Sequence, residues 1–309
     1  MIIHHGYKNL SLKNPVVTMG IFDGVHRGHR FLLDSLVTRA RETGGESVAI
    51  TFNPHPRIVL NKSAKDLLFL SAMEEKIILL GESGVDHLVI VEFTRDFSRI
   101  KACDFVEKIL VSDIGTRYLI IGHDHHFGHR AEGDYNTVES CAVSAGFMVE
   151  QVEGFKTPEG ILSSSMIREA LLKGRTDDAN KWLGYNYSVK GTVVEGRKIG
   201  RRIGYPTANI DPSDKYKLIP ADGVYAVEAR IEGDILKGML SIGKNPTVNH
   251  KAVKRSIEVN IFNFTKDIYG KDIEVIFRYR LRDEKKFNST GELARQMEKD
   301  KARALQMLL

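Results

Sequence analysis

The apolar residues of this 309-residue chain change their spacing near residue 185, and this change constrains the fold more than any other feature. Before that point, short apolar runs alternate with segments of helical spacing, a pattern typical of a parallel sheet covered by helices. We therefore expect an α/β domain over residues 1–184, with ligands at the carboxyl ends of its strands. The apolar runs occupy 16–22, 47–52, 86–93, 118–122 and 147–152.

Residues 185–309 carry strand-like segments instead, and turn signals such as Asp222-Gly223 separate them. Because closure would hide the edges of these strands, we predict a small antiparallel β-barrel. Apolar residues at helical spacing over 290–309 predict a final helix that closes the barrel. A chain of this length also favours two domains over one. The expected strands are 188–195, 224–231, 236–242, 256–264 and 273–281.

Composition and charge narrow the class of protein. The chain lacks both a signal-like start and an apolar run of about 18 residues, so we predict a cytoplasmic protein that does not bind membranes. The formal net charge is +5, but the basic runs are short, which favours phosphorylated small molecules over nucleic acid. Cys103 and Cys141 lack CxxC spacing, so we expect reduced thiols that serve in packing. The oligomeric state is not predicted.

The stretch GIFDGVHRGHR, residues 20–30, lies where a predicted strand meets a predicted helix. If the helix begins near Arg27, His26 and His29 share one side of its first turn, at the positive end of the helix dipole. Gly24 and Gly28 would let a phosphate approach the backbone. A turn with surface histidines, or a metal site, are the alternatives.

A second anion site is expected at Ser163, Ser164 and Ser165, which precede a helical pattern over 167–172 and gather hydroxyls and N–H groups at its start. Arg168 adds a forked cation. A simple helix cap is the alternative. The loop GHDHHFGH, residues 122–129, holds residue types that bind metals, and it is alternatively a surface loop at a strand end.

In the second half, an extended segment over 207–210 would place the side chains of Thr207 and Asn209 on one face. Two oxygen donors of this kind suit Mg²⁺, although a loop that caps itself would use the same residues. Between 256 and 264, alternation puts Ile257, Val259 and Ile261 on one face and turns Glu258 to the other. The pattern alone makes Glu258 a solvated strand carboxylate.

The quoted stretches of the first half resemble motifs of the nucleotidyltransferase superfamily. Residues 20–29 match its Gly-x-Phe-Asp-Gly-x-His-x-Gly-His motif, 51–56 its Phe-x-Pro-His-Pro stretch and 162–168 its Ser-Ser-x-Ile-Arg motif. The resemblance implies that His29 and Arg168 are catalytic and that ATP is bound by Gly20, Phe22, Asp23, Gly24, His26, Gly28, His29, Ser163, Ser164, Ser165 and Arg168.

Residues 122–128 are similar to a Gly-x-Asp-Phe-x-Phe-Gly stretch of bacterial FMN adenylyltransferases, which lies beside the flavin. His125 departs from that pattern, since the family commonly has Phe there. This resemblance and that of the Phe-x-Pro-His-Pro stretch imply that flavin is bound by Asn53, His55, Pro56, Asp124 and Phe127.

The second half resembles riboflavin kinases in Pro206-Thr207-Ala208-Asn209, and also over 222–226, 242–247 and 257–300. The resemblance implies that Thr207 and Asn209 hold the magnesium of MgATP and that Glu258 is the catalytic base. It further implies that ATP is bound by Gly200 and Gly204, and riboflavin by Arg282 and Glu284.

Together the motifs follow the order found in bacterial bifunctional riboflavin kinase/FMN adenylyltransferases, also called FAD synthetases. This implies a Rossmann-like nucleotidyltransferase domain over 1–184 and a riboflavin kinase-like β-barrel over 185–309. The expected reactions are riboflavin plus ATP to FMN plus ADP, and FMN plus ATP to FAD plus pyrophosphate. Two alternatives stay open: a protein with one activity, the kinase being the more secure, and a flavin or nucleotide sensor without turnover.

Overall fold

The computed structural model spans residues 1–309 and describes all of them except 61–66, 124–127, 129–132, 197–199, 201–203 and 246–253. The chain forms two compact units, Met1–Ser164 and Ser165–Leu309. Helices α6 (Ser164–Leu172) and α7 (Thr176–Leu183) lie between this division and residue 184, where we place the domain boundary from the sequence. That boundary stays a prediction.

The first unit contains a six-stranded sheet in the order β1-β4-β3-β2-β5-β6, with every neighbouring pair parallel. The predicted α/β fold class is therefore confirmed. The edge strand β1 was not predicted, because its four residues are mostly exposed and show no apolar alternation. The strands are β1 (Ile2–His5), β2 (Val16–Met19), β3 (Ser47–Asn53), β4 (His87–Glu92), β5 (Tyr118–Gly122) and β6 (Met148–Val152).

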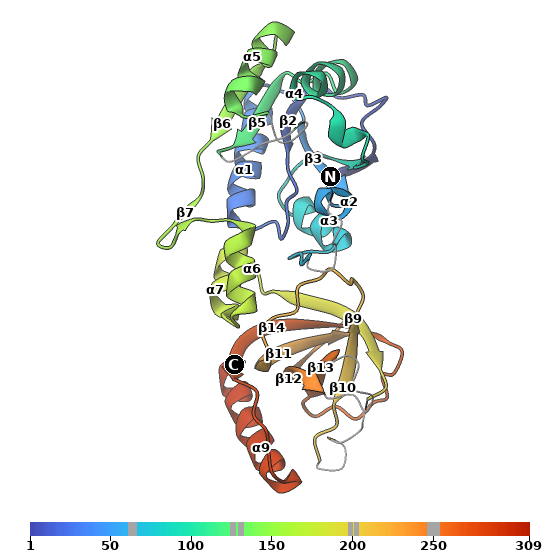
Figure 1. Ribbon diagram of the computed structural model, residues 1–309, viewed down its shortest axis with the longest axis vertical. Helices are drawn as coiled ribbons and strands as arrows, with labels where there is room; N and C mark the ends of the chain where they lie inside the picture. The colour runs from blue at the N-terminus through green and yellow to red at the C-terminus, as the bar shows by residue number, and fades with distance from the viewer. Residues whose placement is uncertain (61–66, 124–127, 129–132, 197–199, 201–203, 246–253) are drawn as a thin grey trace. The chain divides into compact units, whose positions relative to one another are not determined.

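Helices cover both faces of this sheet, as the ribbon in Figure 1 shows. In β2, Val16 belongs to the core formed with α1 (Arg27–Glu42) and α3 (Met73–Gly81). Its neighbour Val17 faces the opposite core, formed with η3 (Phe105–Asp113) and α5 (Tyr135–Ala145). A strand buried on both faces reads as a continuous apolar run, which explains the pattern in the sequence. The remaining elements are α2 (Pro56–Leu60), η2 (Phe97–Arg99), α4 (Ala102–Asp104), β7 (Lys156–Thr157) and β8 (Gly160–Ile161).

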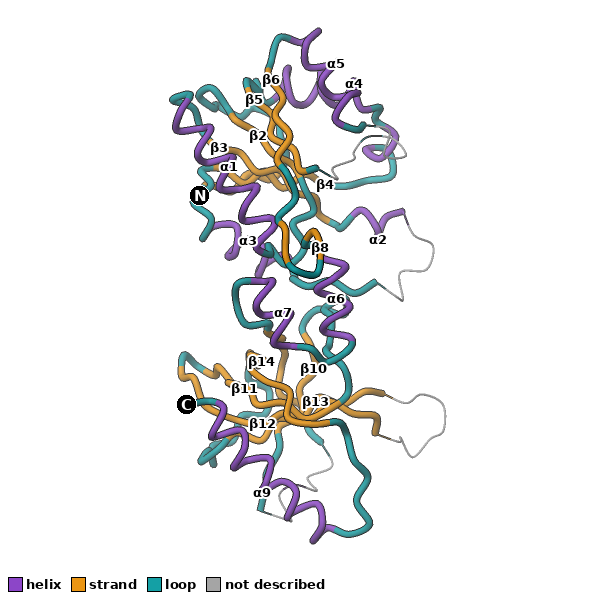
Figure 2. Tube along the Cα trace, turned by 90° about the vertical axis from the view of Figure 1, so that its left-hand side faces the viewer, coloured by secondary structure: helices purple, strands orange, loops and turns teal. Residues whose placement is uncertain are grey.

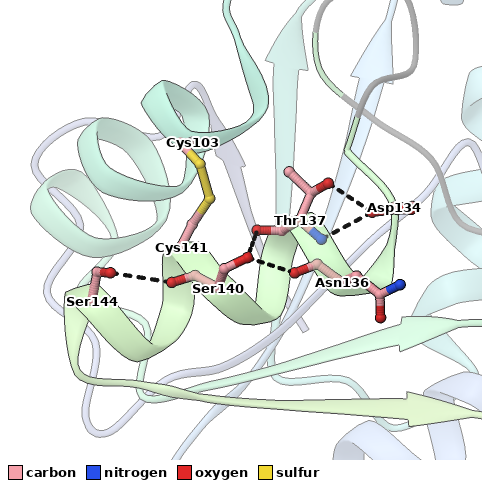
Figure 3. The surroundings of a disulfide bond; sticks show 7 residues. All are labelled: Cys103, Asp134, Asn136, Thr137, Ser140, Cys141 and Ser144. Carbon is pink, nitrogen blue, oxygen red and sulfur yellow. Dashed lines mark hydrogen bonds between the residues drawn. A yellow bond between two sulfur atoms is a disulfide. The ribbon is translucent and has the colours of Figure 1, made fainter.

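A disulfide joins Cys103 of α4 to Cys141 of α5, with their Cα atoms 5.6 Å apart (Figure 3). The expectation of two reduced thiols is therefore wrong. The two helices pack together on one face of the sheet, although 38 residues separate the cysteines along the chain, so their spacing carries no signal of the pairing.

Asp134 caps the start of α5, because its side chain accepts a hydrogen bond from the Thr137 N–H at 2.9 Å.

The second unit contains a closed barrel in the order β10-β13-β12-β11-β14-β9, with every pair antiparallel. This confirms the predicted barrel. Its strands are drawn in orange in Figure 2. The final helix, α9 (Thr290–Met307), is also confirmed; it packs Ala304 against Val224 and Leu281 of the barrel. The strands are β9 (Ser188–Val194), β10 (Ala208–Pro212), β11 (Gly223–Ile231), β12 (Asp234–Asn245), β13 (Lys254–Ile261) and β14 (Asp272–Arg282).

Reduction of the Cys103–Cys141 bond is expected to lower the free energy of unfolding of the first unit by about 2–4 kcal/mol, because the bond restricts the unfolded chain. Urea unfolding with and without a thiol reductant measures this difference. The Cys141→Ser variant is the control, and its unfolding should be insensitive to reductant. Two titratable thiols in unreduced, denatured protein would contradict the pairing.

Candidate active sites

The first candidate site lies where β2 ends and α1 begins, at the carboxyl edge of the parallel sheet. Phe22, Gly24 and Val25 in this turn have φ values of 49°, 80° and 36°. A positive φ strains side-chain-bearing residues, and a β-branched valine most of all. Phe22 and Val25 are fully buried in the core beneath α1, and this packing fixes the turn. Gly20 is closely packed here, since a Cβ would lie 3.1 Å from the Phe22 ring.

His26 ends the turn and caps α1, with its Nδ1 accepting a hydrogen bond from the His29 N–H at 3.3 Å. The two imidazoles stack with their centroids 3.7 Å apart, so they do share one side of the first turn. Because Nδ1 of His26 is an acceptor, the proton of its neutral ring is on Nε2. Gly28 allows this stacking, because a Cβ there would lie 3.1 Å from the His26 ring.

His29 is held as a neutral imidazole. Burial lowers its pKa well below the ordinary 6.5, and the proximity of His26 and of Lys76 lowers it further. Its Nδ1 is buried and has no hydrogen-bond partner among the described residues. A buried ring nitrogen without a partner is costly in a native structure. His29 is therefore suited to hydrogen bonding with a ligand rather than to ion pairing.

Asp23 organises the surroundings of the two histidines. Its Oδ1 accepts hydrogen bonds from the N–H groups of Leu70 and Ser71 at 2.9 and 3.1 Å. The Ser71 hydroxyl in turn accepts a hydrogen bond from the Gly24 N–H at 2.9 Å. Ser164 donates from its hydroxyl to the Asp23 carbonyl at 3.0 Å, which ties the start of α6 to the turn. Ser71 was not predicted, because its partners lie 47 and 48 residues away.

The other predicted phosphate ligands lie around the start of α6. Ser163 directly precedes that helix, and Ser165 and Arg168 follow within its first two turns. Arg168 donates from Nη1 to the Ser165 hydroxyl at 3.3 Å, within the second unit. The assignment of these three residues to ATP stays a prediction.

Of the predicted flavin residues, Asn53 ends β3, and His55 and Pro56 follow it at the same edge of the sheet. The His55 ring stacks on Phe69 with centroids 4.3 Å apart, and the Asn53 carbonyl accepts a hydrogen bond from the Phe93 N–H at 3.1 Å. Asp124 and Phe127 lie outside the described residues. Their predicted contact with flavin is therefore not addressed by the structure.

The second candidate site is arranged around β13 of the barrel, which stands between two cavities. Val259 and Ile261 line a cavity of about 300 Å³, together with the 264–269 segment. Glu258 and Asn260, on the other face of the strand, line a cavity of about 280 Å³. The predicted alternation along this strand is therefore confirmed. Thr207 lines both cavities, so it lies where the contents of the two would meet.

Oxygen donors gather at this shared wall. Thr207 donates from its hydroxyl to Oε2 of Glu258 at 3.1 Å. Asn209 lies directly opposite Glu258 in the β10–β13 pairing, and its side chain packs against Gly196, where a Cβ would lie 1.9 Å from Nδ2. A hydroxyl, a carboxylate and an amide within one small region suit a hard cation such as Mg²⁺. Gly196 was not predicted as a site residue.

The cavity on the Glu258 side is closed by groups from β14 and α9. Arg282 donates to both carboxylate oxygens of Asp300, at 2.7 Å from Nη2 to Oδ2 and 3.1 Å from Nε to Oδ1. Glu284 lies so near Gly243 that a Cβ there would come within 2.1 Å of Oε1. The predicted Gly200, Arg282 and Glu284 all line this cavity, whereas Gly204 does not. Asp300, which orients Arg282, was not predicted.

Comparison with known proteins supports this division of the chain. Residues 8–166 match the FAD synthetase family and residues 183–308 match the riboflavin kinase family. The chain is similar to bifunctional riboflavin kinase/FMN adenylyltransferases from Listeria monocytogenes, with 38% identity over 93% of this chain and 90% of the relative, and from Bacillus subtilis, with 35% identity over 98% and 95%.

A solved structure from Streptococcus pneumoniae superimposes with a TM-score of 0.88 at 32% identity, and covers 98% of each chain. That structure is named as a macrolide-efflux protein. In the part of the present chain that the structure describes, no helix combines the length and apolar character needed to cross a membrane. The two family matches cover most of both units.

The His29 imidazole is expected to remain neutral when the pH is lowered from 7 to 6, because burial lowers its pKa well below 6.5. NMR titration of the histidine ring resonances measures this, with the His29→Gln variant identifying the signal. Free histidine added to the sample provides the internal reference. Titration of the His29 signal near pH 6.5 would contradict the described environment.

Proposed function

This chain belongs to the bifunctional riboflavin kinase/FMN adenylyltransferase family, and from that premise we propose that it makes FMN from riboflavin and FAD from FMN. ATP is consumed in both reactions, the first in the barrel and the second at the edge of the parallel sheet. The observation that carries the proposal is the Thr207–Glu258 pair on the wall between two cavities.

In the barrel, we assign ATP to the cavity lined by 264–269 and riboflavin to the cavity lined by Arg282 and Glu284. The flavin's 5′-hydroxyl oxygen attacks the γ-phosphorus, and the bond from that phosphorus to the ADP oxygen breaks. A neutral alcohol is a weak nucleophile, so a carboxylate that accepts its proton accelerates the step. Glu258 is the carboxylate at the shared wall, and its hydrogen bond from Thr207 orients it.

Thr207 and Asn209 fit Mg²⁺ by their donor chemistry. We also assign Gly200 and Gly204 to ATP, although Gly200 lines the cavity assigned to riboflavin and not the one assigned to ATP. The bound cation would balance the charge of the ATP phosphates. The chain's own contribution is to align ATP with riboflavin and to hold the proton on Glu258 after transfer. FMN and ADP then leave.

At the edge of the sheet, a phosphate oxygen of FMN attacks the α-phosphorus of ATP and pyrophosphate departs. The FMN phosphate is already largely ionised at pH 7, its second pKa being about 6, so this reaction needs no general base. It needs alignment and stabilisation of the charge on pyrophosphate. The neutral His29 and the His26 Nε2 proton supply hydrogen-bond groups for this purpose.

We assign Gly20, Phe22, Asp23, Gly24 and Gly28 to the same ATP site, with Asp23 acting through the Leu70–Ser71 backbone rather than on phosphate. Ser163, Ser164, Ser165 and Arg168 are proposed phosphate ligands, Arg168 for the charge of the leaving pyrophosphate. FMN is assigned to Asn53 at the end of β3 and to His55 and Pro56 after it. Asp124 and Phe127 are assigned to the same site.

The Glu258→Gln variant should lower the rate of FMN formation from riboflavin by about 10²–10⁴-fold, because an amide cannot accept the proton of the alcohol. FAD formation from supplied FMN should be unchanged. Chromatography of the flavins measures both. The control is Glu228→Gln, which changes a barrel carboxylate that pairs with Arg278 outside the two cavities. Equal loss in both variants would argue against Glu258 as the base.

The His29→Ala variant should lower FAD formation from FMN by about 10²–10³-fold, since one hydrogen-bond group for the developing charge is lost. FMN formation from riboflavin should continue at the normal rate. His4→Ala is the matched control, because His4 hydrogen-bonds His87 on the distant β1–β4 edge. If His29→Ala stopped both reactions while the protein stayed folded, two separate sites would be excluded.

A further inference from the structure

Lys76, on α3, is a buried amine that the reactions described above do not use. Only 5% of the residue is exposed, and lysine is seldom buried so completely without a partner. No other described residue forms an ion pair with it. Burying such a group costs desolvation free energy, and groups of this kind occur more often at functional sites than elsewhere.

The structure ties the start of α3 to the turn between β2 and α1, residues 20–26, which we call the histidine turn. The Asp23 carboxylate holds the backbone of Leu70 and Ser71, and Ser71 in turn holds the Gly24 N–H. Helix α3 begins two residues later, and Lys76 lies at its fourth position. These contacts cross between segments 47 residues apart in the sequence, so they fix α3, and Lys76 with it, against the turn.

The charge of Lys76 is coupled to both Asp23 and His29. Burial lowers the pKa of Lys76 from 10.5 to about 8, and Asp23 opposes this change. Lys76 contributes in turn to the lowered pKa of His29. The residues that precede Lys76 on its own helix are Glu74 and Glu75, and Glu75 accepts a hydrogen bond from the Ala72 N–H.

The histidine turn lacks a positive charge of its own. His29 is neutral and Asp23 adds a negative charge, yet the proposed ligand is a polyphosphate. The arginines on the first turn of α1 are at least partly exposed: Arg27 lies over the Phe155 ring, and Arg30 pairs with Glu82 through Nη2. Among the described residues of the first unit, Lys76 is therefore the buried cation at the turn.

We propose that Lys76 is a further ATP-binding residue of the adenylylation site, where its ammonium group balances the charge of the polyphosphate beside His29. This inference rests on the proposed function of the first unit. The bound anion favours the ammonium form, so a proton is taken up when ATP binds above pH 8.

The pH dependence follows from this linkage. Below pH 8 the free enzyme already carries the ammonium and binds ATP fully. As the pH rises above about 8, the free enzyme loses that proton, and kcat/KM for ATP should fall up to tenfold per pH unit. The FMN phosphate, with a second pKa of about 6, does not titrate in this range.

The experiment measures FAD formation from supplied FMN by the full-length protein, with ATP varied at pH 7–9.5. Lys76→Met should lower kcat/KM for ATP at pH 7 by about 10–100-fold, the loss of a charge-assisted hydrogen bond, and should abolish the fall above pH 8. Lys76→Arg retains the charge at every pH tested, so it should restore part of the rate with a flat profile. Lys108→Met, which removes an exposed lysine paired with Asp104, is the control.

Thermal unfolding separates this role from a structural one. Methionine removes the desolvation cost, so Lys76→Met should be at least as heat-stable as the wild type; a structural lysine would leave the variant less stable. If Lys76→Met fails to fold, the flat profile of Lys76→Arg decides. A wild-type rate and pH profile in either variant would overturn the inference. Absence of FAD formation by the wild type would instead reject the proposed function.

Discussion

Every strand of the first unit's sheet runs in the same direction, so the carboxyl ends of all its strands lie along a single edge. The histidine turn follows β2, Asn53 ends β3 just before His55 and Pro56, and Gly122 ends β5 where the histidine-rich stretch of the sequence begins. Hydrogen bonding between parallel strands therefore brings segments that lie far apart in the sequence to the same edge of the sheet. The candidate phosphate and flavin residues of this unit depend on that common direction.

The two proposed sites differ because their nucleophiles differ. Riboflavin presents an alcohol, and we propose that the Glu258 carboxylate of the barrel accepts its proton. FMN presents an anion, and the groups proposed for it at the edge of the sheet are the neutral His29 imidazole, backbone amides and a buried amine. Each set of residues fits the protonation state of the nucleophile that the family's reactions require. One chain can thus carry two reactions of ATP without sharing catalytic groups.

Most of the fold could be predicted from apolar spacing, because the parallel strands are buried on both faces and the barrel strands largely alternate. The His26–His29 stacking and the direction of Glu258 were also predictable, since both follow from local geometry. Contacts between distant segments were not. Ser71 reaches Gly24 across 47 residues, and Asp300 reaches Arg282 only after α9 folds back on the barrel. The Cys103–Cys141 pairing likewise depends on the packing of two helices.

Strand β1 and residue Lys76 illustrate a second limit. The four residues of β1 form a strand because they pair with β4. The sequence of these four residues gives no sign of that pairing. Lys76 is a charged residue inside an apolar helical pattern, where a solvated position is the ordinary interpretation. Only the packing of α3 against the histidine turn shows that the amine is buried.

The position of β13 between two cavities has a consequence for how this protein tolerates change. Neighbouring residues of a strand face opposite sides, so a shift of one residue would turn Val259 toward the place of Glu258. Both cavities would lose their chemistry together, although no residue had been substituted. An insertion or deletion within β13 is therefore expected to damage the site more than the substitution of one side chain.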